Sequence, residues 1–192
     1  MIMQKIQKVA ETFSGYTFRD GIQSSDAGEL KVIQAKNIEE LTDLKVLISV
    51  ERFPNDEKYF LRNKDILIIS KGMTNTVNML NLDSNDKFVI ASAAFIIIRA
   101  NKDIVDPSFL TWYLQLPETQ ELLKSFQRIS TVPNLSIKAI LDLNIPILPM
   151  EKQQKLGQLH QLHQKRKHIH SILEKKRSTL IDMQLLNILK DE

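Results

Sequence analysis

The last quarter of the sequence constrains the fold most, because it is a long run without a helix breaker. From residue 150 to about residue 189 there is no proline, and the one glycine, Gly157, lies near the start. The run is rich in Lys, Gln, Glu and Leu, which are strong helix formers. We therefore predict one continuous helix of roughly 60 Å, at about 1.5 Å per residue.

Apolar residues recur along this predicted helix with the 3.5-residue period of a coiled-coil seam. The members of this stripe are Leu159, Leu162, Ile169, Leu173, Leu180 and Met183. Arg166, Lys176 and Asn187 interrupt the same frame, so the seam is imperfect. Because a lone amphipathic helix is only marginally stable in water, we expect a partner helix and a dimer contact through the stripe.

The preceding residues have the pattern of a globular α+β domain, with a mixed, curved β-sheet and flanking helices. Short runs of strand-forming residues cover 30–35, 46–50, 66–70 and 88–99. The spacing of Ile2, Ile6, Val9 and Phe13 predicts a helix over residues 1–13, which Gly15 is placed to end. The predicted organisation is a domain over 1–149 and a long helix over 150–192.

Helix boundaries are marked clearly in the second half of the domain. Asp106 and Pro107 are typical of a helix start, and Pro117 must break or restart that helix. A further helical stretch follows to residue 126, and Ser136 is placed to cap a short helix that ends at residue 143. Residues 144–149 (NIPILP) are predicted to be extended, since two prolines remove hydrogen-bond donors there.

Composition disfavours several classes of enzyme. The chain has no cysteine, which excludes disulfides, thiolate zinc sites and cysteine catalysis. None of the five glycines belongs to a phosphate-binding loop, so dinucleotide-binding and P-loop enzymes are disfavoured. All four histidines lie on the predicted coiled coil, and no acidic residue stands three or four positions from the pair His160 and His163. We predict no catalytic and no metal-binding residue.

Charge divides the chain into a near-neutral body and a basic tail. Residues 1–150 carry 17 Lys and Arg against 18 Asp and Glu, whereas residues 151–192 carry 9 against 5. The body therefore lacks the strong basic field of a stand-alone DNA-binding domain. No signal peptide or apolar run of membrane-spanning length is evident, so we expect a cytoplasmic protein without a membrane contact.

Two clusters of hydrogen-bonding side chains are candidate DNA contacts. Asn side chains suit adenine edges, while Lys, Arg, Ser and Thr reach phosphates or guanine. The first cluster is Lys71, Thr74, Asn75, Thr76 and Asn78, and the second is Arg128, Ser130, Thr131 and Asn134. Polar surface loops without a ligand have the same composition, so the residues alone leave both interpretations open.

Short motifs follow one another along residues 10–180. They are SGYTF at 14–18, LRNKDILI at 61–68 followed by Lys71 and Gly72, FIIIR at 95–99, DPSFLTWYL at 106–114, TVPNLS at 131–136 and LDLNIPILPMEKQ at 141–153. In this order the motifs resemble one half of the specificity subunits of type I restriction–modification systems. Residues 61–68 are similar to the family's L-x-x-G-D-I-L-I strand, although Lys64 replaces the glycine, and residues 14–18 are similar to its entry turn.

This resemblance implies a non-catalytic target-recognition domain that reads one half of a bipartite site in double-stranded DNA. It also implies modification (methyltransferase) subunits that bind S-adenosylmethionine and a restriction subunit that uses ATP, with no cofactor on this chain. Family members usually carry two such domains and two helices. We therefore expect a half-length subunit that forms a homodimer or pairs with another half-subunit. The alternative is a coiled-coil interaction or scaffold protein without sequence-specific DNA binding.

Overall fold

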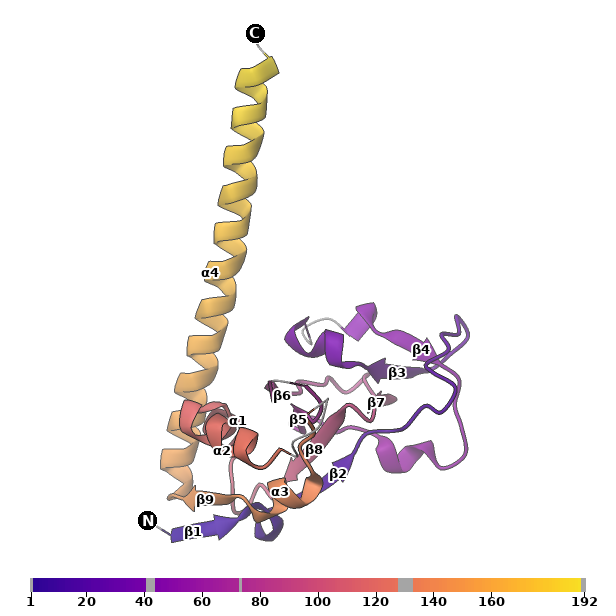
Figure 1. Ribbon diagram of the computed structural model, residues 1–192, viewed down its shortest axis with the longest axis vertical. Coiled ribbons are helices and arrows are strands. Elements are labelled where there is room, and N and C mark those ends of the chain that lie inside the picture. Colours follow the sequence, from indigo (N-terminus) through magenta and orange to yellow (C-terminus); the bar gives the residue numbers. More distant parts are fainter. Residues whose placement is uncertain (1, 41–43, 73, 128–132, 191–192) are drawn as a thin grey trace. The chain divides into compact units, whose positions relative to one another are not determined.

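The computed structural model describes residues 2–40, 44–72, 74–127 and 133–190. The chain divides into two compact units, one that ends at Gly157 and one that begins at Gln158. The first unit contains every strand and the three short α-helices, and the second is the remainder of a long helix (Figure 1).

A four-stranded antiparallel sheet lies at the centre of the first unit. Its strands follow the order β2 (Ala10–Ser14), β8 (Phe95–Ala100), β5 (Ile66–Ile69) and β6 (Val77–Met79). Ile66 pairs with Ile98 and Ile68 with Ile96, which fixes the register of the two central strands. Both central strands are therefore flanked by a paired strand on each side.

The central sheet is buried on both faces, which explains the continuous apolar runs in its sequence. Successive side chains of a strand point to opposite faces. Ile66 and Ile68 accordingly pack into the cluster that contains Phe109 of helix α1 (Pro107–Gln115), whereas Leu67 packs into a second cluster with Phe95.

The remaining strands form two smaller sheets. One is mixed, in the order β4 (Ile48–Val50), β3 (Leu30–Ile33) and β7 (Val89–Ala91), with β3 antiparallel to β4 and parallel to β7. The other pairs β1 (Ile2–Lys5) with β9 (Asn144–Ile147). Four 3-10 turns complete the unit, η1 (Ile6–Lys8), η2 (Ala35–Glu40), η3 (Leu44–Val46) and η4 (Asp56–Tyr59). The α+β class with a mixed sheet is confirmed.

The predicted helix starts are confirmed at atomic detail. Asp106 caps α1 (Pro107–Gln115) by accepting a hydrogen bond from the Phe109 N–H at 2.9 Å. Helix α2 (Pro117–Ser125) restarts at a proline, and the Ser136 hydroxyl caps α3 (Ile137–Asp142).

The predicted helix over residues 1–13 is wrong, because these residues form β1, η1 and β2. Ile6 and Val9 are buried as the helical spacing requires, but η1 buries them between two strands. β1 and β2 pair with β9 and β8, which lie far away in the sequence. Gly15 also does not end a helix. A Cβ there would stand 2.1 Å from the Ser92 carbonyl oxygen, so glycine allows two backbones to approach.

The long C-terminal helix is confirmed as α4 (Met150–Lys190). The first two turns of α4 belong to the first compact unit. The boundary between the two units therefore follows Gly157, whereas the sequence places it after residue 149. Gln153 is buried there, where it donates to the Leu148 and Ile104 carbonyls and accepts from the Asp106 N–H. Gly157 is needed for this packing, since an added Cβ would lie 2.8 Å from the Phe109 nitrogen.

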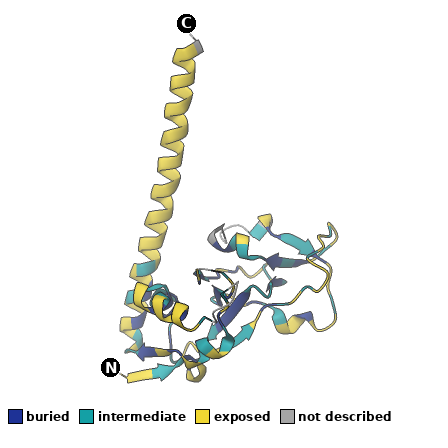
Figure 2. Ribbon diagram, in the orientation of Figure 1, coloured by how far each residue is buried: buried dark blue, intermediate teal, exposed yellow. Residues whose placement is uncertain are grey.

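Beyond Gly157 the described side chains of α4 are exposed (Figure 2), apart from the half-buried His160. The six side chains of the apolar stripe are among these exposed residues, and their exposed fractions range from 47 % at Ile169 to 67 % at Leu159. No helix in the described part of the chain combines the length and the apolar character needed to cross a membrane.

Candidate nucleic-acid interface

Four residues of the first predicted cluster lie in the hairpin loop that joins β5 to β6, and the fifth, Asn78, lies in β6 itself. Ile68 pairs with Val77, and the Ile69 N–H donates to the Thr76 carbonyl at 3.0 Å, which closes the base of the loop. Gly72 adopts a φ of +111°, a conformation that side chains rarely tolerate, so glycine is required for the turn.

The structure brings the hairpin loop together with the end of the second predicted cluster. Lys71 forms an antiparallel bridge with Asn134, and the Gly72 N–H donates to the Pro133 carbonyl at 3.0 Å. The Leu135 N–H donates to the Ser70 carbonyl at 2.8 Å. Two segments more than 50 residues apart therefore form one rim at this end of the central sheet.

The structure corrects the prediction that Asn75 contacts a base. Its side chain is fully buried, and its amide donates to the Ile69 carbonyl at 2.9 Å. Its side-chain oxygen accepts from the Gln127 amide at 2.8 Å. Asn75 therefore holds the loop in shape, and Gln127, which the sequence-based prediction missed, is its partner.

Asn78 is half-buried in β6, and its side chain makes two hydrogen bonds within the fold. Its amide donates to the Ile38 carbonyl at 2.8 Å, which ties β6 to η2, and its side-chain oxygen accepts from the Met79 N–H.

Of the predicted residues that the structure describes, Lys71, Thr74 and Asn134 are exposed, and Thr76 and Asn78 are half-buried. We call the three that lie in the loop after β5, together with Asn134, which is bridged to that loop, the polar rim. The polar rim thus consists of Lys71, Thr74, Thr76 and Asn134. Arg128, Ser130 and Thr131 lie outside the described residues. The rim offers a cation, hydroxyls and an amide beside one another, which are the groups that read base edges and phosphates.

The opposite end of the central sheet is held by a buried ion pair. Arg99 Nε and Nη2 donate to the two oxygens of Asp65 at 2.9 and 2.7 Å, and the Asp65 side chain is only 2 % exposed. Asp65 also accepts from the Arg62 N–H at 2.7 Å. This carboxylate explains the aspartate of the LRNKDILI motif, because it fixes both the turn before β5 and the end of β8.

Ion pairs elsewhere in the first unit shift the pKa of two carboxyl groups. Hydrogen bonds from the Arg52 guanidinium, which lies between the Phe60 and Phe88 rings, hold the pKa of buried Asp56 below its ordinary value. The Lys5 ammonium, at 2.7 Å, likewise lowers the pKa of Asp142. Both carboxylates stay charged near pH 7, and neither lies in the polar rim. Among the described residues, no group of three metal-ligating side chains is close enough to hold an ion.

The chain thus combines an α+β domain that bears a polar rim with a long helix that exposes an apolar stripe. The family model for the type I restriction modification DNA specificity domain matches residues 3–176. The chain belongs to this family, as the order of its motifs predicts. No match was found among curated proteins.

Solved structures share the fold at low sequence identity. The type I restriction-modification S subunit from M. genitalium superposes with a TM-score of 0.61 at 15 % identity, over 92 % of this chain and 42 % of that one. The HsdS subunit from Thermoanaerobacter tengcongensis superposes with a TM-score of 0.61 at 17 % identity, over 85 % of this chain and 37 % of that one.

A chain from a study of complex assembly and conformational transition of the type I R-M system gives a TM-score of 0.64 at 17 % identity, over 96 % of this chain and 43 % of that one. This chain therefore spans about two fifths of the length of the structures that it matches.

Proposed function

We propose that the chain is a specificity subunit that reads one half of a bipartite DNA site for a type I restriction–modification complex and performs no catalysis itself. The observation that carries the proposal is the family match, which extends over both the recognition domain and most of α4. The polar rim is the part of the domain that we assign to base reading.

Partner subunits supply the chemistry in this proposal. Modification subunits bind S-adenosylmethionine and methylate the DNA, and a restriction subunit uses ATP. The partners also supply much of the electrostatic attraction to DNA, since residues 1–150 are near neutral. In this scheme the chain acts in the cytoplasm.

Helix α4 pairs with a second helix of the same kind through its apolar stripe. Six exposed apolar residues at coiled-coil spacing on one helix form a surface that water disfavours. A homodimer joins two recognition domains and suits a symmetric target, whereas pairing with another half-subunit suits an asymmetric one. The competing candidate, a scaffold protein, shares the helix and differs in having no sequence preference for DNA.

The polar rim is tested by the double substitution Thr74→Ala and Asn134→Ala in the complex with modification subunits. We expect discrimination between the target and single-base variants to fall by roughly 5- to 150-fold, because a good base contact contributes about 1–3 kcal/mol. The salt dependence of binding should stay unchanged, since the substitutions remove no charge. Competition binding with a panel of duplexes measures both quantities.

The matched control is Thr17→Ala with Asn85→Ala, which removes the same two groups from exposed positions outside the rim. It should leave both quantities at wild-type values. An equal loss on every DNA sequence, or an equal loss in the control, contradicts the assignment of base reading to the rim.

A further inference from the structure

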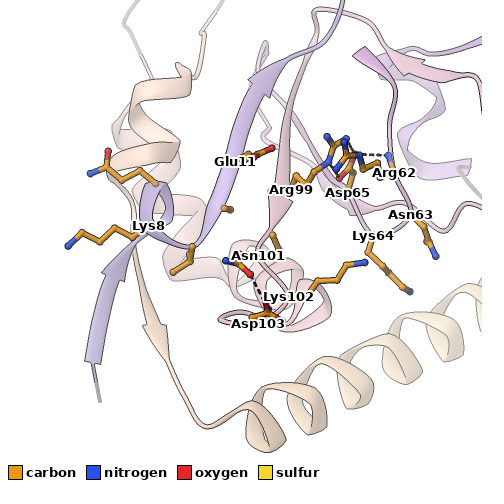
Figure 3. Close-up of a pocket in the computed structure, with 14 residues that line it drawn as sticks. Lys8, Glu11, Arg62, Asn63, Lys64, Asp65, Arg99, Asn101, Lys102 and Asp103 are labelled. Atoms are coloured by element: carbon orange, nitrogen blue, oxygen red, sulfur yellow. Dashed lines mark hydrogen bonds and ion pairs between the residues drawn. The ribbon is translucent and has the colours of Figure 1, made fainter. Parts of the chain in front are cut away.

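A second candidate ligand site lies at the end of the central sheet that is remote from the polar rim. A cavity of about 560 Å³ opens there, between η1, the start of β2, the turn before β5 and the turn after β8 (Figure 3). The polar rim follows β5, whereas this cavity borders the residues that precede β5. The two features are therefore separated by the length of the strand.

The lining of the cavity carries an excess of positive charge. Five cationic side chains, Lys8, Arg62, Lys64, Arg99 and Lys102, meet three carboxylates, Glu11, Asp65 and Asp103. Asp65 is fully engaged by Arg99, so four cations remain against two carboxylates. Arg62 and Lys102 are exposed, and neither forms an ion pair with any carboxylate in the described part of the chain.

Lys64 occupies a backbone conformation that favours glycine. Its φ is +75°, and it stands where the resembling motif has glycine. A side chain in this region carries a steric cost that glycine avoids. The lysine adds a charge to the cavity lining in spite of this cost, and its ammonium is held by Asn81 Oδ1 at 2.8 Å.

The wall behind these cations is preorganised. Arg99 and the Arg62 backbone N–H meet at the Asp65 carboxylate, and Figure 3 shows this group with Lys64 and Lys102 projecting from the two adjoining turns. Arg99 also donates to the Phe60 carbonyl at 3.0 Å. A ligand therefore meets turns whose backbones are already fixed, which lowers the entropic cost of binding.

The lining chemistry fits phosphate groups better than a protein surface. Arg, Lys and side-chain amides such as those of Gln7 and Asn101 are the usual contacts of DNA phosphates. None of the described residues that line the cavity is aromatic, whereas protein interfaces are anchored by buried aromatic residues.

The location also fits a duplex that already contacts the polar rim. β5 has four residues and spans roughly 13 Å at about 3.3 Å per residue. Successive phosphates of one DNA strand are about 3.4 Å apart along the axis, so roughly four nucleotides cover that length. A single duplex segment is therefore long enough to reach both ends of the sheet.

We propose that this cavity is a phosphate clamp that holds the DNA backbone beside the half-site read by the polar rim. The proposal rests on the proposed function and adds a site that contributes affinity without sequence preference. Arg62, Lys64 and Lys102 are its principal cations.

The clamp is tested by the triple substitution Arg62→Gln, Lys64→Gly and Lys102→Gln in the complex with modification subunits. The probes are a duplex enriched by that complex from a random pool and a scrambled duplex of equal length. Binding of both should weaken by about tenfold or more at about 0.1 M salt. The plot of log K against log salt should become shallower by roughly 2–3, since each phosphate contact contributes about 0.9. The ratio of the two affinities should stay unchanged.

Stability provides a second readout that a damaged fold would not reproduce. Lys64→Gly alone removes the strained conformation, so its Tm should equal the wild-type value or exceed it by about 2–4 °C while DNA binding weakens. The matched control Arg19→Gln, Lys58→Gln and Lys87→Gln removes the same three charges from exposed positions outside the cavity. It should keep the wild-type salt dependence.

Three results overturn the clamp. The first is an unchanged salt dependence in the triple variant, and the second is an equal change in the control. The third is loss of the modification subunits from the triple variant but not from the control, which would make the cavity a protein interface. Failure of the proposed function looks different, because the wild-type complex would then enrich no sequence, while the salt dependence on a random duplex would still test the cavity.

Discussion

Placing charges in the seam of α4 should abolish its pairing. We expect the double substitution Leu173→Asp and Leu180→Asp to convert a dimer into monomers at micromolar concentration. Burial of one leucine side chain contributes about 1.5–3 kcal/mol, and a homodimer buries four of these leucines. A loss of roughly 6–12 kcal/mol of association free energy leaves a dimer of micromolar affinity dissociated at micromolar concentration. Sedimentation equilibrium measures the mass, and circular dichroism confirms that the recognition domain stays folded.

A matched control separates the seam from general effects of charge on the helix. Ser171 and Ser178 are exposed, have the same seven-residue spacing and lie outside the apolar stripe. Ser171→Asp with Ser178→Asp should therefore keep the dimer. A wild-type chain that is monomeric at every concentration, or a seam variant with an unchanged mass, would show that the stripe is not the pairing surface.

The second large effect concerns the buried pair that holds the turn before β5. Arg99→Met should lower the free energy of unfolding by about 3–5 kcal/mol, because it leaves the Asp65 carboxylate buried without its partner. That loss is a large share of the total free energy of unfolding, which is about 5–15 kcal/mol for ordinary domains. Methionine keeps an apolar side chain at this position, so the change removes mainly the contacts of the guanidinium, among them the one over the Phe13 ring. Urea unfolding measures the loss.

Two further variants test the reason for this loss. Arg99→Met combined with Asp65→Asn should recover about 1–3 kcal/mol, since a neutral amide costs less to bury and still accepts from the Arg62 N–H. Lys5→Met breaks the exposed pair with Asp142 and should leave the free energy of unfolding almost unchanged, because solvent screens that pair. Equal losses for the single and double Arg99 variants would contradict the argument from the buried charge.

Local signals in the sequence predicted the helices of this chain well. The α1 cap at Asp106, the restart at Pro117, the α3 cap at Ser136 and the 41-residue α4 each depend on interactions within a few residues. Propensity and capping preferences describe such interactions directly. The structure therefore agrees with the prediction at these positions.

The N-terminal strands could not be found in the same way. The apolar spacing of residues 2–13 fits a helix, and only pairing with distant strands overrides it. Likewise, the run 88–99 appears as one strand, but it divides into β7 and β8 because residues 92–94 turn the chain from one sheet to another. β6 was missed because its three residues include the polar Asn78 and follow a polar loop, so they form no run of strand-forming residues.

The candidate site shows the same division between local and distant information. Residue type identified the cluster around Lys71, yet nothing local distinguishes buried Asn75 from exposed Thr74. Their difference arises from Gln127, about 50 residues away, whose side-chain amide donates a hydrogen bond to the Asn75 side chain. The cavity beside Arg62 and Lys102 was not predicted, although the lysine in place of glycine at position 64 was a visible signal.

In the proposed function, this chain gives a DNA-modifying complex its sequence preference. The most direct test is to purify the chain with modification subunits and select binders from a randomised DNA pool. We expect one enriched site with two halves at a fixed spacing, which is lost when this chain is omitted. A stable complex that enriches no sequence would contradict the claim and leave α4 as the feature of a structural protein.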